Sequence, residues 1–431
     1  MIQTESEIIN KRKTEFSDTR DLLPLAEKFK DKKVVMLGEA SHGTHQYYNR
    51  RARLTRILMS EYDFNFMAVE GDWPTCYELN RHVKNYSDAE EKTFDVLQQF
   101  DRWPVWMWAN WEIYEWAQWL REFNEGKPSN RRKGFYGLDV YSLWESLEAI
   151  MDYLKGRDPS ALETAREAIR CFEPHRGGDG QKYALSTRIV PEGCEKEVTK
   201  LLTEIVSKAP AYNSDREHVF STKQNAITAK NAEEYYRKMV TGDSTWNLRD
   251  KHMMNTLDRL LEFHGEDSKG IVWAHNTHIG DASYTDMADS GMFNIGELAR
   301  KRHGRENVAL IGFGSYQGSV LAGDAWGEPV KVMNLPAGKE GSFEAMCHEA
   351  GDQFFIFSDD LRKSDFFEKA IPHRAVGVVY HPEREQYGNY VPSIIPNRYD
   401  AFIFFDRSDA LNAIPVGAEK KKLPETYPFG L

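Results

Sequence analysis

Two short apolar runs near the N-terminus enclose a segment with helical spacing. The runs are VVML at 34–37 and FMAV at 66–69. The apolar residues between them that recur at helical spacing, after a capping residue at Thr44, are Tyr47, Tyr48, Leu54, Ile57, Leu58 and Tyr62. Two parallel strands need a crossover connection, which is usually a helix. Residues 34–69 therefore predict a βαβ unit, and such units build parallel sheets covered by helices.

Further short apolar runs continue this pattern along the chain. They lie at 134–138, 271–274, 308–313, 354–357, 375–379 and 401–405. Residues 156–265 differ, because they contain helical patterns such as AEEYYRKMV and no convincing strand. The sequence thus predicts an α/β fold with a mostly parallel central sheet flanked by helices. We expect the two halves of this core at 1–155 and 266–431, with the insertion at 156–265 as a helical cap over the cleft.

Charge and composition limit the classes of partner. The formal net charge of −11 argues against nucleic acid, because phosphate binding needs a basic face. The N-terminal stretch MIQTESEIINKRKTEF lacks the apolar region of a secretory signal, and no stretch is apolar enough to span a membrane. The cysteines, which are far apart and form no CxxC pair, are Cys76, Cys171, Cys194 and Cys347. These features predict a cytoplasmic protein with reduced thiols.

Ionisable residues follow four of the predicted strands directly. In chain order they are Glu39 and His42, Glu70 and Asp72, Asp139, and His275 and His278. A single acidic residue after a strand is often only the cap of the next helix, which is a sufficient explanation for Asp139 taken alone. However, ligands of parallel sheets bind at the carboxyl ends of the strands, and several ionisable groups are costly to bury together without a function. The four strand ends therefore predict one polar site.

Two common kinds of site do not fit these residues. A serine nucleophile is disfavoured, because the glycines around Ser41 in GEASHG do not have the GxSxG spacing. A nucleotide site is disfavoured as well, since the chain has no P-loop motif and GFGSYQG at 312–318 misses GxGxxG by one position.

Two mechanisms remain open from the residues alone. His42, Glu70, His275 and His278 are suitable ligand types for a catalytic divalent metal such as zinc, although HExxH is missing. Alternatively, an imidazole beside a carboxylate can act as a general base on water, and a second histidine or an arginine can stabilise the oxyanion. Arg51 could reach the site from the first helix, or it could be one of several solvated arginines there.

The motifs resemble those of the erythromycin esterase family, which includes succinoglycan biosynthesis homologues. The resemblance is carried by LGEASHGTHQYYNRRARLTRIL, FMAVEGDWP, WAHNTHIGD and VGVVYHPERE, and it extends from about residue 20 to 406. It implies hydrolysis of a carboxylic ester, in known members a macrolide lactone, without a required metal or other cofactor.

The resemblance also implies roles for individual residues. The positions that match the family's site residues are Glu39, His42, Arg51, Glu70, His275 and His278. His42 would be the base that activates water, and Glu70 or Glu39 would orient the His42 ring. Arg51 and His275 would contact the ester carbonyl or the water, and His278 would complete the site. The partner would then be a small-molecule ester, with neither a nucleic acid nor a membrane involved.

Substrate contacts and rival functions are less constrained. The run at 102–120 contains six tryptophans, and a buried helix face or an apolar wall for a large ligand would explain it. We take Trp106, Trp73 and Asp139 as candidate substrate contacts. His45 is expected at most behind the site, and His82 and His381 are expected to have no special role. The rival functions are a metal-dependent hydrolase and a non-catalytic accessory protein of polysaccharide biosynthesis.

Overall fold

A nine-stranded, mostly parallel sheet forms the centre of the described residues. The computed structural model describes residues 4–18, 20–176, 181–187, 193–212, 215–240 and 245–416. The strand order is β1-β8-β11-β6-β2-β5-β3-β4, with β7 paired to β6. All pairs from β11 to β4 in this order are parallel, whereas β8 pairs with β1 and β11 in the antiparallel sense. The predicted fold class is therefore confirmed.

Seven of the predicted strands are present. They are β2 (Val34–Leu37), β3 (Phe66–Asp72), β4 (Gly134–Asp139), β5 (Gly270–Trp273), β6 (Val308–Ala322), β8 (Gln353–Phe357) and β11 (Ala401–Ser408). The strands that the sequence patterns did not predict are β1 (Thr14–Glu15), β7 (Lys331–Leu335), β9 (Ile371–Arg374) and β10 (Tyr390–Ser393).

The strand predicted at 375–379 is wrong. The neighbouring β9 pairs with β10 in a separate two-stranded sheet. Residues 376 and 379 make only isolated bridges, one with Ser41 and one with Gly323. The amide of Val376 donates to the carbonyl of Ala40, beyond the end of β2. This apolar segment therefore crosses the carboxyl ends of the strands instead of joining the sheet.

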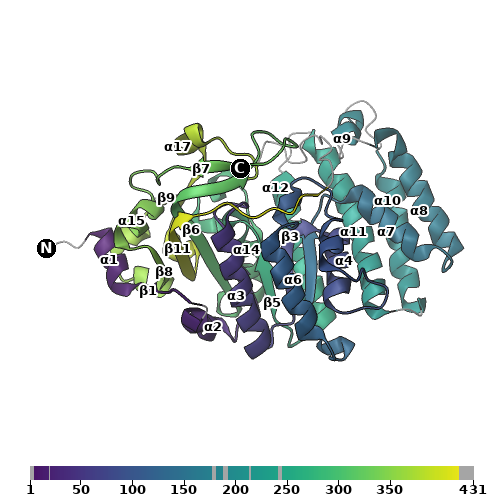
Figure 1. Ribbon diagram of the computed structural model, residues 1–431. Coiled ribbons are helices and arrows are strands. Elements are labelled where there is room, and N and C mark those ends of the chain that lie inside the picture. The colour runs from purple at the N-terminus through teal and green to yellow at the C-terminus, as the bar shows by residue number, and fades with distance from the viewer. Residues whose placement is uncertain are drawn as a thin grey trace.

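Alternating side chains of the strands enter two different cores. Val35 and Leu37 pack into one core, and Val34 and Met36 pack into the other. Helices α2 (Leu23–Phe29), α3 (His45–Glu61) and α6 (Trp111–Asn124) cover the first face, and Figure 1 shows α3 and α6 in front of the strands. The second face is covered by α12 (Thr245–His264), α14 (Ile295–His303) and α15 (Phe343–Ala350). Both sheet faces are thus buried, as parallel sheets require.

A group of helices follows β4 and lies beside the sheet (Figure 1). It contains α7 (Leu143–Leu154), α8 (Pro159–Phe172), α9 (Gln181–Thr187), α10 (Glu195–Lys208) and α11 (Arg216–Met239). These helices share a hydrophobic core of their own. The last helix before β5, α12, returns to the sheet, because Met253, Leu257 and Leu260 pack on its second face. The division of the chain at 155 and 265 stays a prediction.

The expectation of four reduced cysteines is corrected by the structure. Cys171 at the end of α8 and Cys194 at the start of α10 form a disulfide, with their Cα atoms 5.9 Å apart. Cys76 and Cys347 are free and buried. Disulfides are uncommon in a reducing cytosol, so the cytoplasmic location stays a prediction. Among the described helices, none combines the length and the apolar character needed to cross a bilayer.

The disulfide yields a first testable expectation. Thiol titration of the unfolded, unreduced protein should find two free thiols, whereas four would contradict the disulfide. Replacing both Cys171 and Cys194 by serine should lower the free energy of unfolding by about 3 kcal/mol, since a cross-link over 23 residues restricts the unfolded chain. Chemical denaturation measures this loss, and Cys347→Ser serves as the control for a buried thiol outside the disulfide.

Candidate active site

A cavity of about 610 Å³ opens at the carboxyl ends of the parallel strands. Its polar wall includes six ionisable residues at or just beyond the carboxyl ends of four neighbouring strands, namely His42, Glu70, Asp72, Asp139, His275 and His278. Because β2, β5, β3 and β4 are adjacent in the sheet, their ends bring these side chains to one edge. The convergence expected from the sequence is therefore present.

The loop that carries His42 is tightly fixed against β6. The Gly43 carbonyl accepts hydrogen bonds from the amides of Leu321 and Leu411. A Cβ atom at residue 43 would lie 1.9 Å from the Leu321 carbonyl oxygen, so only glycine fits there. Ser41 is buried and pairs its hydroxyl with that of Thr44, 2.5 Å away, outside the residues that line the cavity. Thr44 is the N-cap residue of α3, as expected, but its side chain makes no capping bond.

His42 is held in one orientation by Glu39. Its Nδ1 donates to Glu39 Oε1 over 2.9 Å, which leaves the Nε2 lone pair available to the cavity. Burial alone would lower the pKa of His42, but the negative charge of Glu70 and the hydrogen bond with Glu39 raise it above its ordinary value. This imidazole therefore has the geometry and the electrostatics of a general base.

Arg51 acts on the cavity only through Glu39. Its Nη2 donates to Glu39 Oε2 over 2.5 Å. The guanidinium is fully buried between the rings of Tyr48 and Trp273, 4.5 and 4.6 Å from their centroids. Neither Arg51 nor Glu39 is among the described residues that line the cavity. Direct contact between Arg51 and an ester carbonyl would need a rearrangement, whereas fixing the Glu39 carboxylate needs none.

His275 presents a hydrogen-bond donor beside His42. The two ring centroids are 5.0 Å apart. The Nδ1 of His275 accepts from the Thr277 amide at 3.3 Å and lies 2.8 Å from the Thr277 hydroxyl, so its proton is on Nε2. That Nε2 is buried and has no hydrogen-bond partner among the described residues. Burial, together with the nearby His42, lowers the pKa of His275 well below its ordinary value, so this ring stays neutral.

His278 has both ring nitrogens engaged by the protein. Its Nδ1 lies 3.0 Å from each oxygen of Asp250, and its Nε2 accepts from Arg249 Nη1 over 3.0 Å. Trp246 stacks on the ring at 4.4 Å between centroids. In this arrangement His278 can orient its neighbours, but it has no free nitrogen for proton transfer.

Arg249 links three of the strand ends, and the sequence patterns did not identify it. Its Nε and Nη2 donate to Asp139 over 2.9 and 2.6 Å, and its Nη2 also donates to Glu70 over 2.8 Å. Arg249 lies in α12, and it is 179 residues away from Glu70 in sequence. No local pattern distinguishes such an arginine on a helix, and the same is true of Asp250. Asp139 is thus the ion-pair partner of Arg249 on the cavity wall. Its predicted contact with a substrate stays a prediction.

Glu70 is an ionised carboxylate in this network. Its Oε2 accepts from the His275 amide over 2.9 Å, and Trp108 Nε1 donates to its backbone carbonyl over 3.1 Å. Burial would raise the pKa of Glu70, but the neighbouring His278 ring, the charge of Arg249 and the hydrogen bond from the His275 amide hold it well below its usual range. The neighbouring Asp72 behaves differently, because burial raises its pKa to about 7 despite the pairing with Arg102.

The two tryptophans proposed as substrate contacts lie in the cores instead. Trp73 is 1% exposed, stacks on Tyr136 and donates to Ser221, and Trp106 is 2% exposed in the other core. Both side chains are packed among apolar neighbours of the cores and are absent from the cavity lining. The tryptophans that line the cavity are Trp103, Trp108, Trp246 and Trp326. The 102–120 run thus supplies an apolar wall, but through Trp103 and Trp108.

Three further histidines considered in the sequence analysis lie outside the cavity lining. His45 begins α3 and pairs with Glu112 on α6, with Nδ1 2.6 Å from Oε1. His82 is buried and bonded to Glu90 and Thr93, and His381 is half-exposed near Glu383.

The donor set does not favour a metal ion. Among the described residues, no three His, Cys, Asp or Glu side chains are arranged to hold one. In addition, the Arg249 guanidinium already neutralises Glu70 and Asp139 at the position where a cation would need them.

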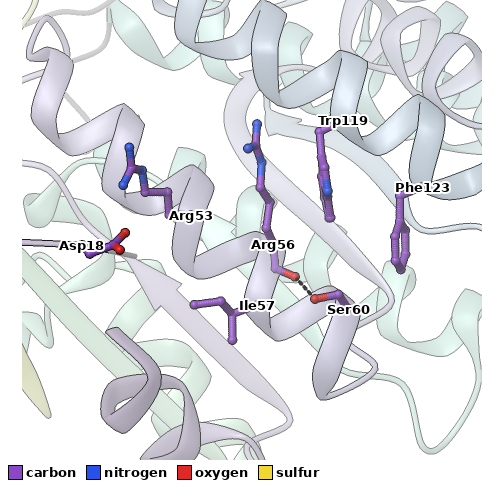
Figure 2. Close-up of a pocket in the computed structure, with 7 residues that line it drawn as sticks. All are labelled: Asp18, Arg53, Arg56, Ile57, Ser60, Trp119 and Phe123. Atoms are coloured by element: carbon purple, nitrogen blue, oxygen red, sulfur yellow. Dashed lines mark hydrogen bonds between the residues drawn. The ribbon is translucent and has the colours of Figure 1, made fainter. Parts of the chain in front are cut away.

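A second cavity, of about 490 Å³, lies between α3 and α6 (Figure 2). Arg53, Arg56, Trp119 and Phe123 line it, and the Ser60 hydroxyl donates to the Arg56 carbonyl over 2.8 Å. It shares no lining residue with the cavity at the strand ends and has no histidine–carboxylate pair.

Comparison with known proteins finds a matching family model and similar sequences. The family model described as erythromycin esterase matches residues 59–408. The protein YbfO of Bacillus subtilis, whose name describes a hydrolase, is 22% identical over 90% of this chain and 87% of its own. Erythromycin esterase type II of Escherichia coli is 21% identical over 78% of this chain and 83% of its own.

Solved structures share the fold. A succinoglycan biosynthesis protein superposes with a TM-score of 0.75 at 18% identity, over 95% of this chain and 97% of its own. A mutant of the erythromycin esterase EreC, in its open conformation, superposes with a TM-score of 0.68 at 18% identity, over 92% of this chain and 98% of its own.

The pairing of His42 with Glu39 can be tested without a substrate. Replacing Glu39 by glutamine removes a negative charge and leaves burial unopposed, so the pKa of His42 should fall. Titration of the imidazole resonances by NMR measures this change. Glu112→Gln is the matched control, since it should lower the pKa of His45, which Glu112 raises, and leave that of His42 unchanged. An unchanged His42 in the Glu39 variant would contradict the described pairing.

Proposed function

The chain belongs to the erythromycin esterase family, and from this premise we propose that it hydrolyses a carboxylic ester with water activated by His42. The observation that carries the proposal is the pair of imidazoles with ring centroids 5.0 Å apart, in which His42 Nε2 is an acceptor and His275 Nε2 is a donor. Ester hydrolysis needs a base for water and a donor for the carbonyl oxygen, and these two rings supply both.

The reaction proceeds through one tetrahedral intermediate. His42 Nε2 removes a proton from water while the water oxygen bonds to the ester carbon. The carbonyl oxygen becomes an oxyanion, which accepts a hydrogen bond from His275 Nε2. The Glu39 carboxylate stabilises the imidazolium, and Arg51 fixes that carboxylate. When the carbon–oxygen bond breaks, His42 returns its proton to the leaving alkoxide, so the products are one carboxylic acid and one alcohol.

The hydrogen-bond network around Arg249 orients His275 and raises the basicity of His42. Glu70 holds the His275 amide, and Arg249 keeps Glu70 ionised and close to His278. Glu70 also attracts the positive charge of protonated His42, which makes this ring more basic. In this scheme Glu70, Arg249 and His278 orient the reacting groups and transfer no proton themselves.

The shape of the cavity favours a large apolar ester. Its walls include Trp103, Trp108, Trp246, Trp326 and Tyr141, and aromatic faces bind extended apolar rings. A volume of about 610 Å³ accommodates a ligand of drug size. Because a relative is named an erythromycin esterase, a macrocyclic lactone is the first substrate to examine, and its hydrolysis would inactivate the antibiotic.

Loss of the base is the direct test of the mechanism. His42→Gln should reduce the rate of ester hydrolysis by about 10²- to 10⁴-fold, which is the usual contribution of a general base. Turnover is read as the gain of one water in product mass. His45→Gln, three residues away and paired with Glu112, is the matched control and should keep full activity. Loss of wild-type activity on chelation would contradict the proposal and favour a metal-dependent hydrolase.

The aromatic wall predicts a preference among substrates. Trp103→Ala and Trp326→Ala, at adjoining rings 4.6 Å apart, should raise KM for a macrocyclic lactone and leave a short aliphatic ester little affected. The physical reason is that only the large ring spans the cavity to these side chains. Parallel steady-state kinetics with both substrates measure the difference. Equal effects on both esters would count against this wall, and binding without turnover of any ester would favour the non-catalytic accessory role.

A further inference from the structure

Asn276 lies between the two histidines of WAHNTH, and the mechanism above gives it no role. We propose that Asn276 is a positioning residue that sets the distance between His275 and His42. It would do so by joining α13 (Asn276–Ile279) both to β6 and to the loop at 38–44 that carries His42, called the first loop below. This inference rests on the proposed function, because only a reaction that uses both rings requires their separation to be fixed.

The side chain of Asn276 binds the backbone of β6 at two points. Its Nδ2 donates to the Phe313 carbonyl over 2.7 Å, and its Oδ1 accepts from the Phe313 amide at 3.3 Å. The same Nδ2 also lies 3.4 Å from His373 Nε2. The amide thus pairs with Phe313 as an additional strand residue would. A carboxylate could not replace it, since it has no hydrogen to donate to the carbonyl.

The backbone of Asn276 binds the first loop and α18 (Ile395–Arg398). Its amide donates to the carbonyl of Glu39 over 2.8 Å. Its carbonyl accepts from Arg398 Nη2 over 2.9 Å. Glu39 is the residue that orients His42, and His275 directly precedes Asn276. One fully buried residue therefore connects both sides of the imidazole pair.

The end of β2 is shaped around this side chain. A Cβ atom at residue 38 would lie 2.1 Å from Asn276 Oδ1, so only a glycine leaves room for the amide. The Gly38 amide donates to the carbonyl of Ile311, which lies two residues before Phe313 in β6. Gly38 and Asn276 thus bind neighbouring positions of the same strand, which anchors the loop that carries His42 and α13 to one another.

The consequence is a sensitivity of the rate to Asn276 that packing alone would not produce. Asn276→Ser keeps a small polar group but is too short to bind both groups of Phe313. Because a displacement of about 1 Å between reacting groups can cost about a hundredfold in rate, we expect kcat to fall by about that factor while KM changes little.

Asn124 provides the matched control. It is equally buried, and its amide also binds backbone at several points, donating to Val83 and Lys133 and accepting from the Lys133 amide. It lies at the end of α6 and does not line the cavity. Asn124→Ser should therefore lower the melting temperature about as much as Asn276→Ser but leave kcat unchanged.

The experiment compares both variants with the wild-type protein in three measurements. These are the melting temperature, kcat and KM for an ester that the wild type cleaves, and the ¹⁵N shifts of the His275 imidazole. A selective loss of kcat in Asn276→Ser, together with shifted His275 resonances, supports the inference. Equal kinetics in the two variants, or His275 resonances unchanged from wild type, overturn it. If the wild type cleaves no ester, the proposed function fails, and the His275 resonances still decide whether Asn276 positions the ring.

Discussion

The arrangement of the site is held by the hydrogen bonds and ion pairs of the Arg249 guanidinium. This guanidinium donates to Asp139 in β4, to Glu70 in β3 and to His278 beyond the end of β5. Two buried carboxylates this close would otherwise repel each other, and burial would favour their protonated forms. With Arg249 between them, Glu70 stays ionised, so it can hold the His275 amide and make His42 more basic. The charge on one helix thus determines the state of several residues on the sheet.

Three histidines of the same site acquire different chemistry from their hydrogen bonds. His42 donates through Nδ1 to a carboxylate and keeps an acceptor nitrogen free. His275 accepts through Nδ1 from Thr277 and keeps a donor free. His278 has neither nitrogen free, since Asp250 and Arg249 occupy both. Residue type alone therefore does not assign a role, because the partner of the second nitrogen determines what the first can do.

The sequence predicted the sheet and its polar edge well, for a physical reason. Buried parallel strands are short apolar runs, and whatever follows them lies at the carboxyl edge, so His42, Glu70 and His275 could be placed together before any coordinates. Arg249 and Asp250 could not be found, because a helix far from the strand ends in sequence shows no local sign of what it faces. The same limit applies to Trp73 and Trp106, whose burial in a core or a cavity depends on tertiary packing. The pairing of Cys171 with Cys194 also depends on where two helices end.

The proposed mechanism requires His42 to act as a base, and the pH dependence of wild-type catalysis measures this basicity. A base must be unprotonated to act, and the pKa of His42 is raised above the ordinary histidine value of about 6.5. The ratio kcat/KM for a cleaved ester should therefore rise with pH through an apparent pKa above that value. A profile that stays flat across this range, or that falls as His42 loses its proton, would show that His42 is not the base.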